Sequence, residues 1–342
     1  MNARYPGFVK GAVASDEWTV REFTALVLEN ERLRVTVLPG HGAKVWELTS
    51  KRAGRDLLFH HPRFDVRPPV FGANPDNWWT GGIDEVAPSG HVCLVGEEEM
   101  PFLGEFWSQA WHYRIEEPGP AVARVHLWAE GIVTPLRLDR WLELRAGEPM
   151  VHGRHRVTNL GFEPQDFMWG IHPAFAIRPG ARIQAPATEA VFWEGHPSLG
   201  VGQGTTYPWP DFRTGDGKVI DNSTAREPDP PTWDLHFLNG LRSGWLAVTD
   251  VESRSGLALA FDREVFPTVW LWGVYGGWRG VYAAVFEAWT SWPTRLDQVI
   301  EAGRQRTLGP GETLETEISY IAYEGLRSVS DVSADGQVGG EK

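Results

Sequence analysis

The run at residues 281–294 (VYAAVFEAWTSWPT) places one carboxylate in the middle of an otherwise apolar segment. In an extended strand alternate side chains point to opposite faces, so Glu287 shares its face with Val285 and Trp289. The other face, which includes Phe286, is apolar as well. A strand that is apolar on both faces is typical of a sheet buried between two layers. We therefore expect a layered β structure with this strand inside it.

The rest of the sequence also divides into short segments. The 38 Gly and 25 Pro residues interrupt many short elements rather than a few long helices, and no segment keeps a helical period over three turns. We predict strands at residues 32–38, 45–48, 56–59, 104–115, 122–129, 136–144, 150–160, 167–177, 245–249, 257–262, 268–274, 281–289 and 313–323. About fifteen strands without a break in composition predict one all-β domain at residues 1–327, a large antiparallel β-sandwich. The small, polar tail at residues 328–342 predicts disorder.

Charge and composition exclude several classes of function. The formal net charge of -13 argues against a nucleic-acid surface and against an anionic membrane surface. A single cysteine, Cys93, excludes an intramolecular disulfide framework and a multi-cysteine zinc site. The N-terminus lacks the apolar core of a signal peptide, and no apolar run is long enough to span a bilayer. These features predict a soluble, cytoplasmic protein.

Two features predict a small-molecule site. Residues 60–90 form a long irregular stretch rich in Pro, Gly and Asn, which is typical of a segment that shapes a site. Asn77 lies within it and His91 directly follows it. The 18 tryptophans exceed ordinary usage, and an indole offers a flat apolar face and one N–H donor to a polyhydroxylated ring. Core packing is the alternative role for any one of them, including Trp270 and Trp272.

Known catalytic and metal motifs are absent. The sequence has no G-x-S-x-G elbow, and its 11 histidines show no HExxH or comparable ligand spacing. We therefore expect neither a metal nor a cofactor.

His172, inside the apolar run FMWGIHPAFAI, and Glu287 are the strongest catalytic candidates. A buried charge without a partner is costly, so such a carboxylate has either a partner or a task. The structural alternatives are an ion pair of Glu287 with an arginine such as Arg279 or Arg295, a position of Glu287 that faces water at a strand end, and a core position for His172. An acid and a base of different kinds that face each other across a pocket can move two protons on one substrate.

Four segments in order resemble the aldose 1-epimerase (galactose mutarotase-like) family. They are residues 33–48 (LRVTVLPGHGAKVWEL), 172–175 (HPAF), 286–293 (FEAWTSWP) and 308–320 (LGPGETLETEISY). The resemblance implies a β-sandwich of the supersandwich type and anomer interconversion without cofactor or metal. Glu287 would take the proton from the O1 hydroxyl as general base, and His172 would protonate the ring oxygen as general acid. An ionised glutamate and a histidine near its pKa suit these roles at pH 7.

The sequence also departs from the family pattern. Leu103 stands where some members carry a second histidine at the substrate, and His91 is a candidate to replace it. Asp234 lies between the two catalytic candidates, where members place a hydroxyl-binding Asp. Thr80 stands where a basic residue would be needed for a phosphate, which favours an unphosphorylated sugar. The full set of expected substrate-binding residues is His91, Asp234, Trp270, Trp272, Glu105 and Asn77.

Two other functions stay open at this point. One is a carbohydrate-binding or regulatory protein on the same scaffold without turnover, which the loss of histidine at Leu103 motivates. The other is a glycosidase or lyase that pairs Glu287 with Asp234 or Glu105. The expected partner is a small sugar, with no nucleic acid and no membrane, and the expected state is a monomer or a homodimer.

Overall fold

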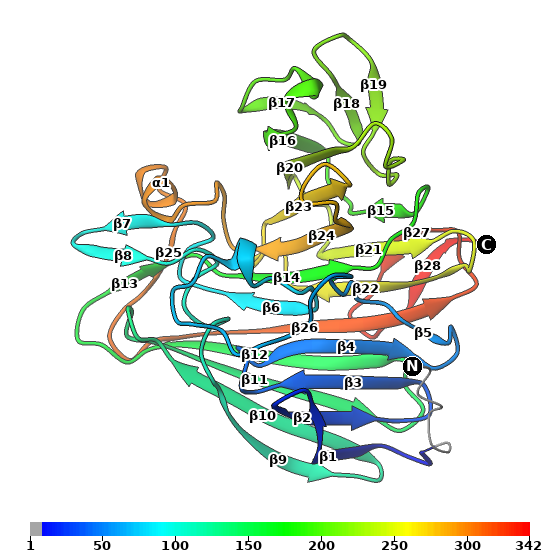
Figure 1. The fold of residues 1–342 in the computed structure, drawn as a ribbon. Coiled ribbons are helices and arrows are strands. Elements are labelled where there is room, and N and C mark those ends of the chain that lie inside the picture. The colour runs from blue at the N-terminus through cyan, green and yellow to red at the C-terminus, as the bar shows by residue number, and fades with distance from the viewer. Residues whose placement is uncertain (1–8) are drawn as a thin grey trace.

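The computed structural model describes residues 9–342, which form two large antiparallel sheets (Figure 1). The 12-stranded sheet has the order β1 (Val13–Val20), β2 (Phe23–Glu29), β3 (Leu33–Leu38), β4 (Lys44–Ser50), β6 (Ile83–Val86), β14 (Gly170–Phe175), β24 (Tyr282–Trp289), β23 (Thr268–Tyr275), β20 (Thr232–Asn239), β16 (Glu189–Gly195) and β17 (Thr205–Pro208), and β5 (Arg55–Asp56) pairs with β4. The 8-stranded sheet has the order β15 (Arg182–Gln184), β21 (Trp245–Asp250), β22 (Ser255–Phe261), β26 (Thr313–Glu324), β12 (Met150–Asn159), β11 (Leu136–Arg145), β10 (Val122–Glu130) and β9 (His112–Pro118).

The remaining elements are short. The two-stranded ribbons are β7 (Cys93–Val95) with β8 (Glu98–Met100), β13 (Gln165–Phe167) with β25 (Arg306–Leu308), β18 (Asp211–Arg213) with β19 (Val219–Asp221), and β27 (Ser328–Val332) with β28 (Val338–Glu341). The helical elements are α1 (Leu296–Glu301) and the two 3₁₀ turns Pro75–Asn77 and Pro197–Leu199. Among residues 9–342, no helix has the length and apolar character needed to cross a membrane.

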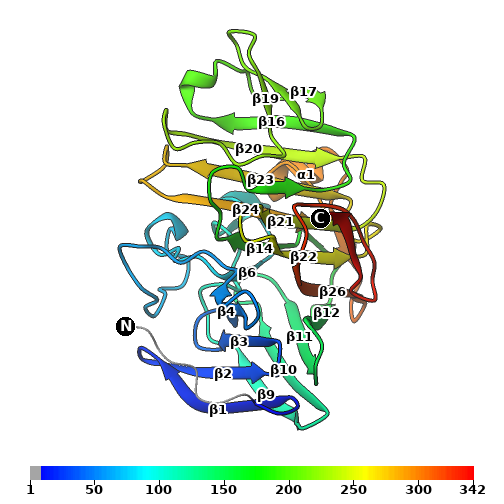
Figure 2. The same cartoon turned by 90° about the vertical axis from the view of Figure 1, so that its right-hand side faces the viewer.

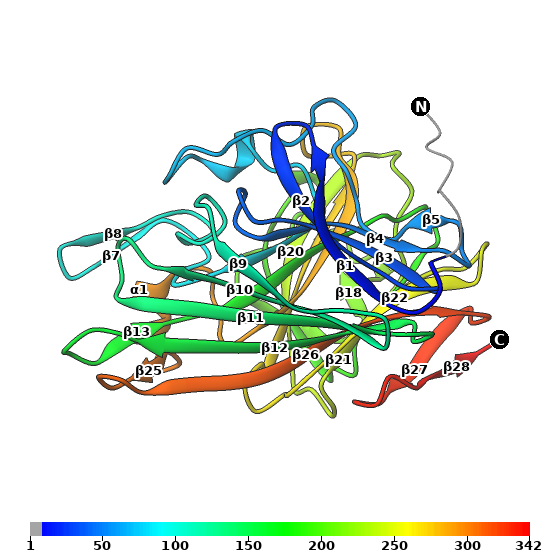
Figure 3. The ribbon, with the colours of Figure 1, turned by 90° about the horizontal axis from the view of Figure 1, so that it is seen from below.

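The main core lies between the two sheets, which face each other in the view from below (Figure 3). Alternation along each strand supplies it, since every second side chain of a strand points to the same layer. Val35 and Ile171 from the 12-stranded sheet and Leu138 and Val157 from the 8-stranded sheet belong to one buried apolar cluster. The sheet order leaves β14, β24 and β23 in the middle of the larger sheet (Figure 2).

Most predicted strands are confirmed, including the buried run of Glu287, which is β24. The expected strand at residues 104–115 is wrong, because the chain turns there and β9 begins only at His112. Leu103 and Gly104 have φ values of 56° and 67°, and a Cβ on Gly104 would lie 1.9 Å from the carbonyl oxygen of Ala87. At this turn the backbone of Gly104 lies so close to that of Ala87 that a side chain would not fit. Residues 56–59 likewise contribute the end of the two-residue strand β5 and an isolated bridge from Leu58 to Phe175, not a strand of their own.

The expected disorder of the tail is also wrong. Residues 328–342 contain the hairpin of β27 and β28, which lies beside β21 and β22 (Figure 2). Val329 and Val332 are buried in a cluster with Met150 and Trp245. The short pattern of apolar and polar residues therefore forms a strand, although the composition of the tail is mostly polar.

Candidate active site

His172 and Glu287 lie opposite each other on neighbouring strands. In the antiparallel ladder of β14 and β24, Ile171 pairs with Ala288, so the next position of β14 faces the preceding position of β24. The ladder pairs are missing at His172 and Pro173 and resume afterwards in the same register. Proline has no backbone N–H to donate, which accounts for the gap. Directly opposite residues share one face of a sheet, so both side chains point to the same side.

The same row continues on both sides of this pair. Asp84 of β6 is the partner of His172, and Trp270 of β23 is the partner of Glu287. Four neighbouring strands thus bring a carboxylate, an imidazole, a second carboxylate and an indole onto one face. The spacing of these residues along the chain does not show this arrangement, because it depends on the register between strands that are far apart in sequence.

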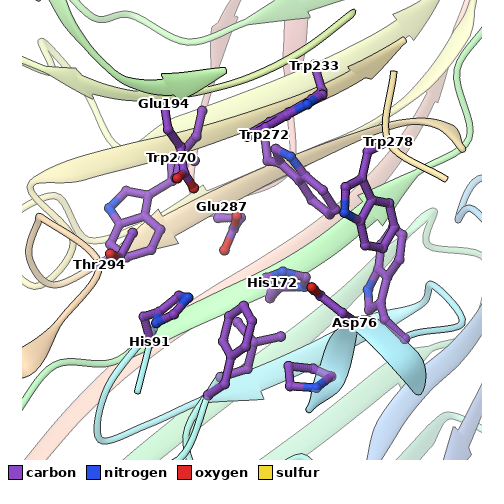
Figure 4. Close-up of a pocket in the computed structure, with 16 residues that line it drawn as sticks. Asp76, His91, His172, Glu194, Trp233, Trp270, Trp272, Trp278, Glu287 and Thr294 are labelled. Carbon is purple, nitrogen blue, oxygen red and sulfur yellow. The ribbon is translucent and has the colours of Figure 1, made fainter. Parts of the chain in front are cut away.

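A cavity of about 260 Å³ lies over this row (Figure 4). It is smaller than the roughly 300–1,000 Å³ pockets that hold drug-sized ligands, so it suits a ligand with one sugar ring. Its apolar walls are mainly indoles, from Trp79, Trp233, Trp270, Trp272 and Trp278. Its titratable side chains are Asp76, His91, His172, Glu194 and Glu287.

Glu287 is a buried carboxyl group, and no lysine or arginine among residues 9–342 pairs with it. Its residue is 3% exposed, and burial raises the pKa of Glu287 to about 8. The Nε1–H of Trp289 donates to its Oε2 at 2.7 Å, which opposes that rise in pKa. The two arginines considered as ion-pair partners lie elsewhere: Arg279 contacts residues 76 and 77, and Arg295 pairs with Asp297. The ion-pair alternative for Glu287 is therefore wrong.

The indole that donates to Glu287 is held in place by close packing. Trp289 stacks on Trp270, with ring centroids 3.9 Å apart and an angle of 12° between the planes. Its other face lies against Gly170, where an added Cβ would be 2.3 Å from the ring. Trp270 in turn donates from Nε1 to the carbonyl oxygen of Ser291 at 3.1 Å. The donor is therefore fixed before any ligand binds.

His172 is buried as well, at 5% exposure. Burial lowers the pKa of His172 to about 4, the charge of Asp84 opposes that change, and the charge of Lys44 adds to it. Lys44 and Asp84 form a buried ion pair at 2.5 Å. The edge of the His172 ring meets the ring of Trp79 at a centroid distance of 6.3 Å. Burial therefore favours a neutral imidazole and a protonated carboxyl group. These protonation states are the reverse of those expected from the sequence.

Five of the eight residues expected at the site line the pocket. They are Glu287, His172, His91, Trp270 and Trp272. The ring of His91 lies against Phe102, with centroids 4.2 Å apart. The side chain of Leu103 also lines the pocket, at the position where a second histidine was expected, and its positive φ belongs to the turn described above.

The other three expected residues lie outside the pocket. Asp234 lies between Trp233 and Leu235, which line the pocket, so its own side chain points to the opposite face of β20. There it is fully buried and contacts Arg226 and His236, and these charges lower its pKa to about 2. The carboxylate of Asp234, which was expected to bind a sugar hydroxyl, is thus already paired with Arg226 and His236.

Glu105 and Asn77 also have structural partners. Glu105 accepts hydrogen bonds from the backbone N–H groups of residues 132–134 and from the hydroxyl of Thr134. Asn77 accepts from Arg279 through its side-chain oxygen and from Arg67 through its carbonyl oxygen. Both residues therefore stabilise loops rather than form a wall of the pocket.

Asp76, Trp79, Trp233, Trp278 and Glu194 line the pocket although no sequence pattern singled them out. The first two belong to the irregular stretch that was expected to shape a site, so their region was identified but not the residues. Glu194 lies one residue before the end of β16 and pairs with Leu235, directly after a register irregularity. No local motif shows that pairing. Among residues 9–342, no group of three or more His, Cys, Asp or Glu side chains is placed to hold a metal ion.

Comparison with solved structures identifies the fold. A galactose mutarotase-like protein from Clostridium acetobutylicum superposes with a TM-score of 0.67 at 16% identity, over 92% of this chain and 99% of that one. The chain has the galactose mutarotase-like fold. A Klebsiella pneumoniae protein provisionally described as an aldose 1-epimerase gives a TM-score of 0.70 at 15% identity, over 92% and 84% of the two chains. No family profile matches the sequence.

The expected β-sandwich is thereby confirmed, and identities this low show the fold alone. Within the galactose mutarotase-like fold of this chain, the pocket lies on the face of the 12-stranded sheet that carries His172 and Glu287. Function must therefore be argued from the side chains of that pocket.

Proposed function

We propose that this protein is an aldose 1-epimerase that interconverts the α and β anomers of a free aldose. The observation that carries the proposal is the placement of His172 opposite Glu287 inside a sugar-sized pocket with indole walls. The likeness in fold to proteins named as mutarotase-like agrees with it. Anomer interconversion needs one proton donor and one proton acceptor, which this pair supplies without any further group.

The pair holds a single proton between about pH 4 and pH 8, because Glu287 keeps its proton up to about 8 and His172 gains one only below about 4. In the resting pocket Glu287 therefore donates to the ring oxygen, while His172 accepts the proton of the O1 hydroxyl. The C1–O bond of the ring breaks, and the O1 lone pair forms the carbonyl group of the open-chain aldehyde. This starting order is the opposite of the order that the family resemblance implies.

Ring closure restores both groups. After the C1–C2 bond rotates, His172 returns its proton to the carbonyl oxygen while Glu287 takes the proton of the C5 hydroxyl, and the hydroxyl oxygen attacks C1 from the other face. Each side chain thus donates once and accepts once in a complete cycle. The N–H of Trp289 stabilises the carboxylate that Glu287 becomes during ring opening.

The test uses freshly dissolved α-glucose, α-galactose and α-xylose, followed by polarimetry or NMR. We expect the protein to accelerate equilibration of at least one sugar, and Glu287→Gln to lose about 10²–10⁴-fold of that acceleration. Glu189→Gln is the matched control, since Glu189 belongs to β16 and does not line the pocket. Binding without acceleration would indicate a carbohydrate-binding protein instead. A new reducing end or an unsaturated product would indicate a glycosidase or a lyase.

A further inference from the structure

The described side chains that line the pocket include carboxyl groups but no lysine or arginine. Three of these lining residues are acidic. Two further depressions share residues with the pocket, one through Asp76 and His91 and the other through Glu194, and their described linings also lack lysine and arginine. Glu99 adds a carboxylate to the first of them. We name Asp76, Glu99 and Glu194 the acidic mouth.

Of the two members of the acidic mouth that line the pocket itself, Asp76 and Glu194, the second has the fewer neutralising contacts. Its carboxylate makes no ion pair and no hydrogen bond with any residue from 9 to 342. His91 lowers the pKa of Glu194, and this effect is smaller than the rise that burial by the pocket walls causes. Asp76, by contrast, has Arg279 at 3.9 Å. No lysine or arginine in the described part of the chain therefore offsets the charge of Glu194 before a ligand arrives.

The neighbouring cations are occupied. Lys44 is buried in its pair with Asp84 and also donates to the carbonyl oxygen of Gly81. Arg279 stacks on Trp278, with its guanidinium carbon 4.8 Å from the ring centroid, and contacts the backbone of Asp76. Neither lines the pocket. An anionic substituent on a sugar would thus meet carboxylates without a compensating donor of positive charge.

We propose that the pocket selects sugars by charge, a proposal that rests on the proposed epimerase function. It accepts uncharged aldoses and aldoses with a protonated amine, and it rejects aldoses with a phosphate or a carboxylate, with Glu194 as the discriminating residue. Unpaired charges of the same sign are an effective means of excluding a ligand. The indole faces of the pocket also favour a cation, because their quadrupoles attract positive charge.

The test compares glucosamine, glucose and glucuronate at pH 6.5, since these sugars share one ring and there carry a positive charge, no charge and a negative charge. We expect kcat/KM to fall in that order, by at least tenfold from glucose to glucuronate. Glu194→Gln should reduce the kcat/KM ratio of glucosamine to glucose and that of glucose to glucuronate several-fold. Glu189→Gln on the same strand should leave both ratios as in the wild type. Equal turnover of glucuronate and glucose, or unchanged ratios in Glu194→Gln, would overturn the proposal.

Binding separates this proposal from the proposed function. Tryptophan fluorescence of the pocket reports binding of the same three sugars without any turnover. If no sugar is epimerised faster, the proposed function fails, and the order of the three dissociation constants still decides charge selection. The weakest binding for glucuronate supports it, and equal or tighter binding of glucuronate contradicts it.

Discussion

His172 and Glu287 face each other across two neighbouring strands, and the ladder between those strands is interrupted at this point. Pro173 removes a donor from the ladder there. A proline in a central strand is normally unfavourable, and this one stands directly after His172. We expect the chemistry of the protein to depend on the protons of these two side chains.

The pH profile follows from their opposite pKa shifts. Burial raises the pKa of Glu287 to about 8 and lowers that of His172 to about 4, so the pair carries one proton between these values. We expect kcat/KM to be constant between about pH 4 and pH 8 and to fall outside this range. The measurement is the rate of anomerisation over this range, with the uncatalysed rate subtracted at each pH. A fall in kcat/KM centred near pH 6.5, the ordinary pKa of histidine, would contradict this expectation.

Glu287 should also affect stability as a function of pH. Its pKa in the folded state lies above its ordinary value of 4.5, so its contribution is fully favourable below about pH 4.5 and is lost as pH rises to about 8. The loss amounts to roughly 5 kcal/mol, at 1.36 kcal/mol for each pKa unit. Glu287→Gln removes this dependence, so its unfolding free energy should exceed that of the wild type increasingly up to about pH 8. Urea denaturation at several pH values measures the difference, and a constant difference would contradict it.

The sequence predicts where the strands lie along the chain better than it predicts which strands pair with each other. The run around Glu287 is apolar on both faces, and that pattern alone places it inside a layered sheet. The position of Asp234 shows the limit. Alternation puts Asp234 and Trp233 on opposite faces of one strand, but which face meets the pocket depends on pairing with strands far away in sequence. Glu194 was missed for the same reason, because its neighbour Leu235 is 41 positions along the chain.

The ion pair of Lys44 and Asp84 beside His172 gives a third prediction. Lys44→Met leaves Asp84 as an uncompensated buried charge, which should cost about 3–5 kcal/mol of stability. It also removes a charge that lowers the pKa of His172, so the acid limb of the pH profile should move to higher pH. Denaturation midpoints and the pH profile measure both effects.

The double substitution Lys44→Met with Asp84→Asn serves as the control for that variant. It removes both charges and should recover most of the lost stability. If the single and the double variants are equally unstable, packing rather than charge determines the effect of Lys44.

Gly170 allows a test of the donor to Glu287. In Gly170→Ala the new Cβ would lie 2.3 Å from the indole of Trp289, so the ring must move and its hydrogen bond to Glu287 is lost. We expect a loss of about 1–3 kcal/mol in stability from overpacking. The pKa of Glu287 should rise further, which moves the basic limb of the pH profile upward. Gly202→Ala is the control, because that site is open and its φ is ordinary. Identical pH profiles in both variants would exclude this role for Trp289.

The most direct test of the account is a double-mutant cycle on the pair itself. Anomerisation rates are measured for His172→Gln, Glu287→Gln and the variant with both changes, with sugar binding followed by fluorescence to show that each variant retains its pocket. If the two groups act as one unit, each single variant loses about 10²–10⁴-fold in rate, and the double variant is no more than roughly tenfold slower than either. A double variant whose loss equals the product of the two single losses, or a single variant with the full wild-type rate, would contradict the proposed shared proton.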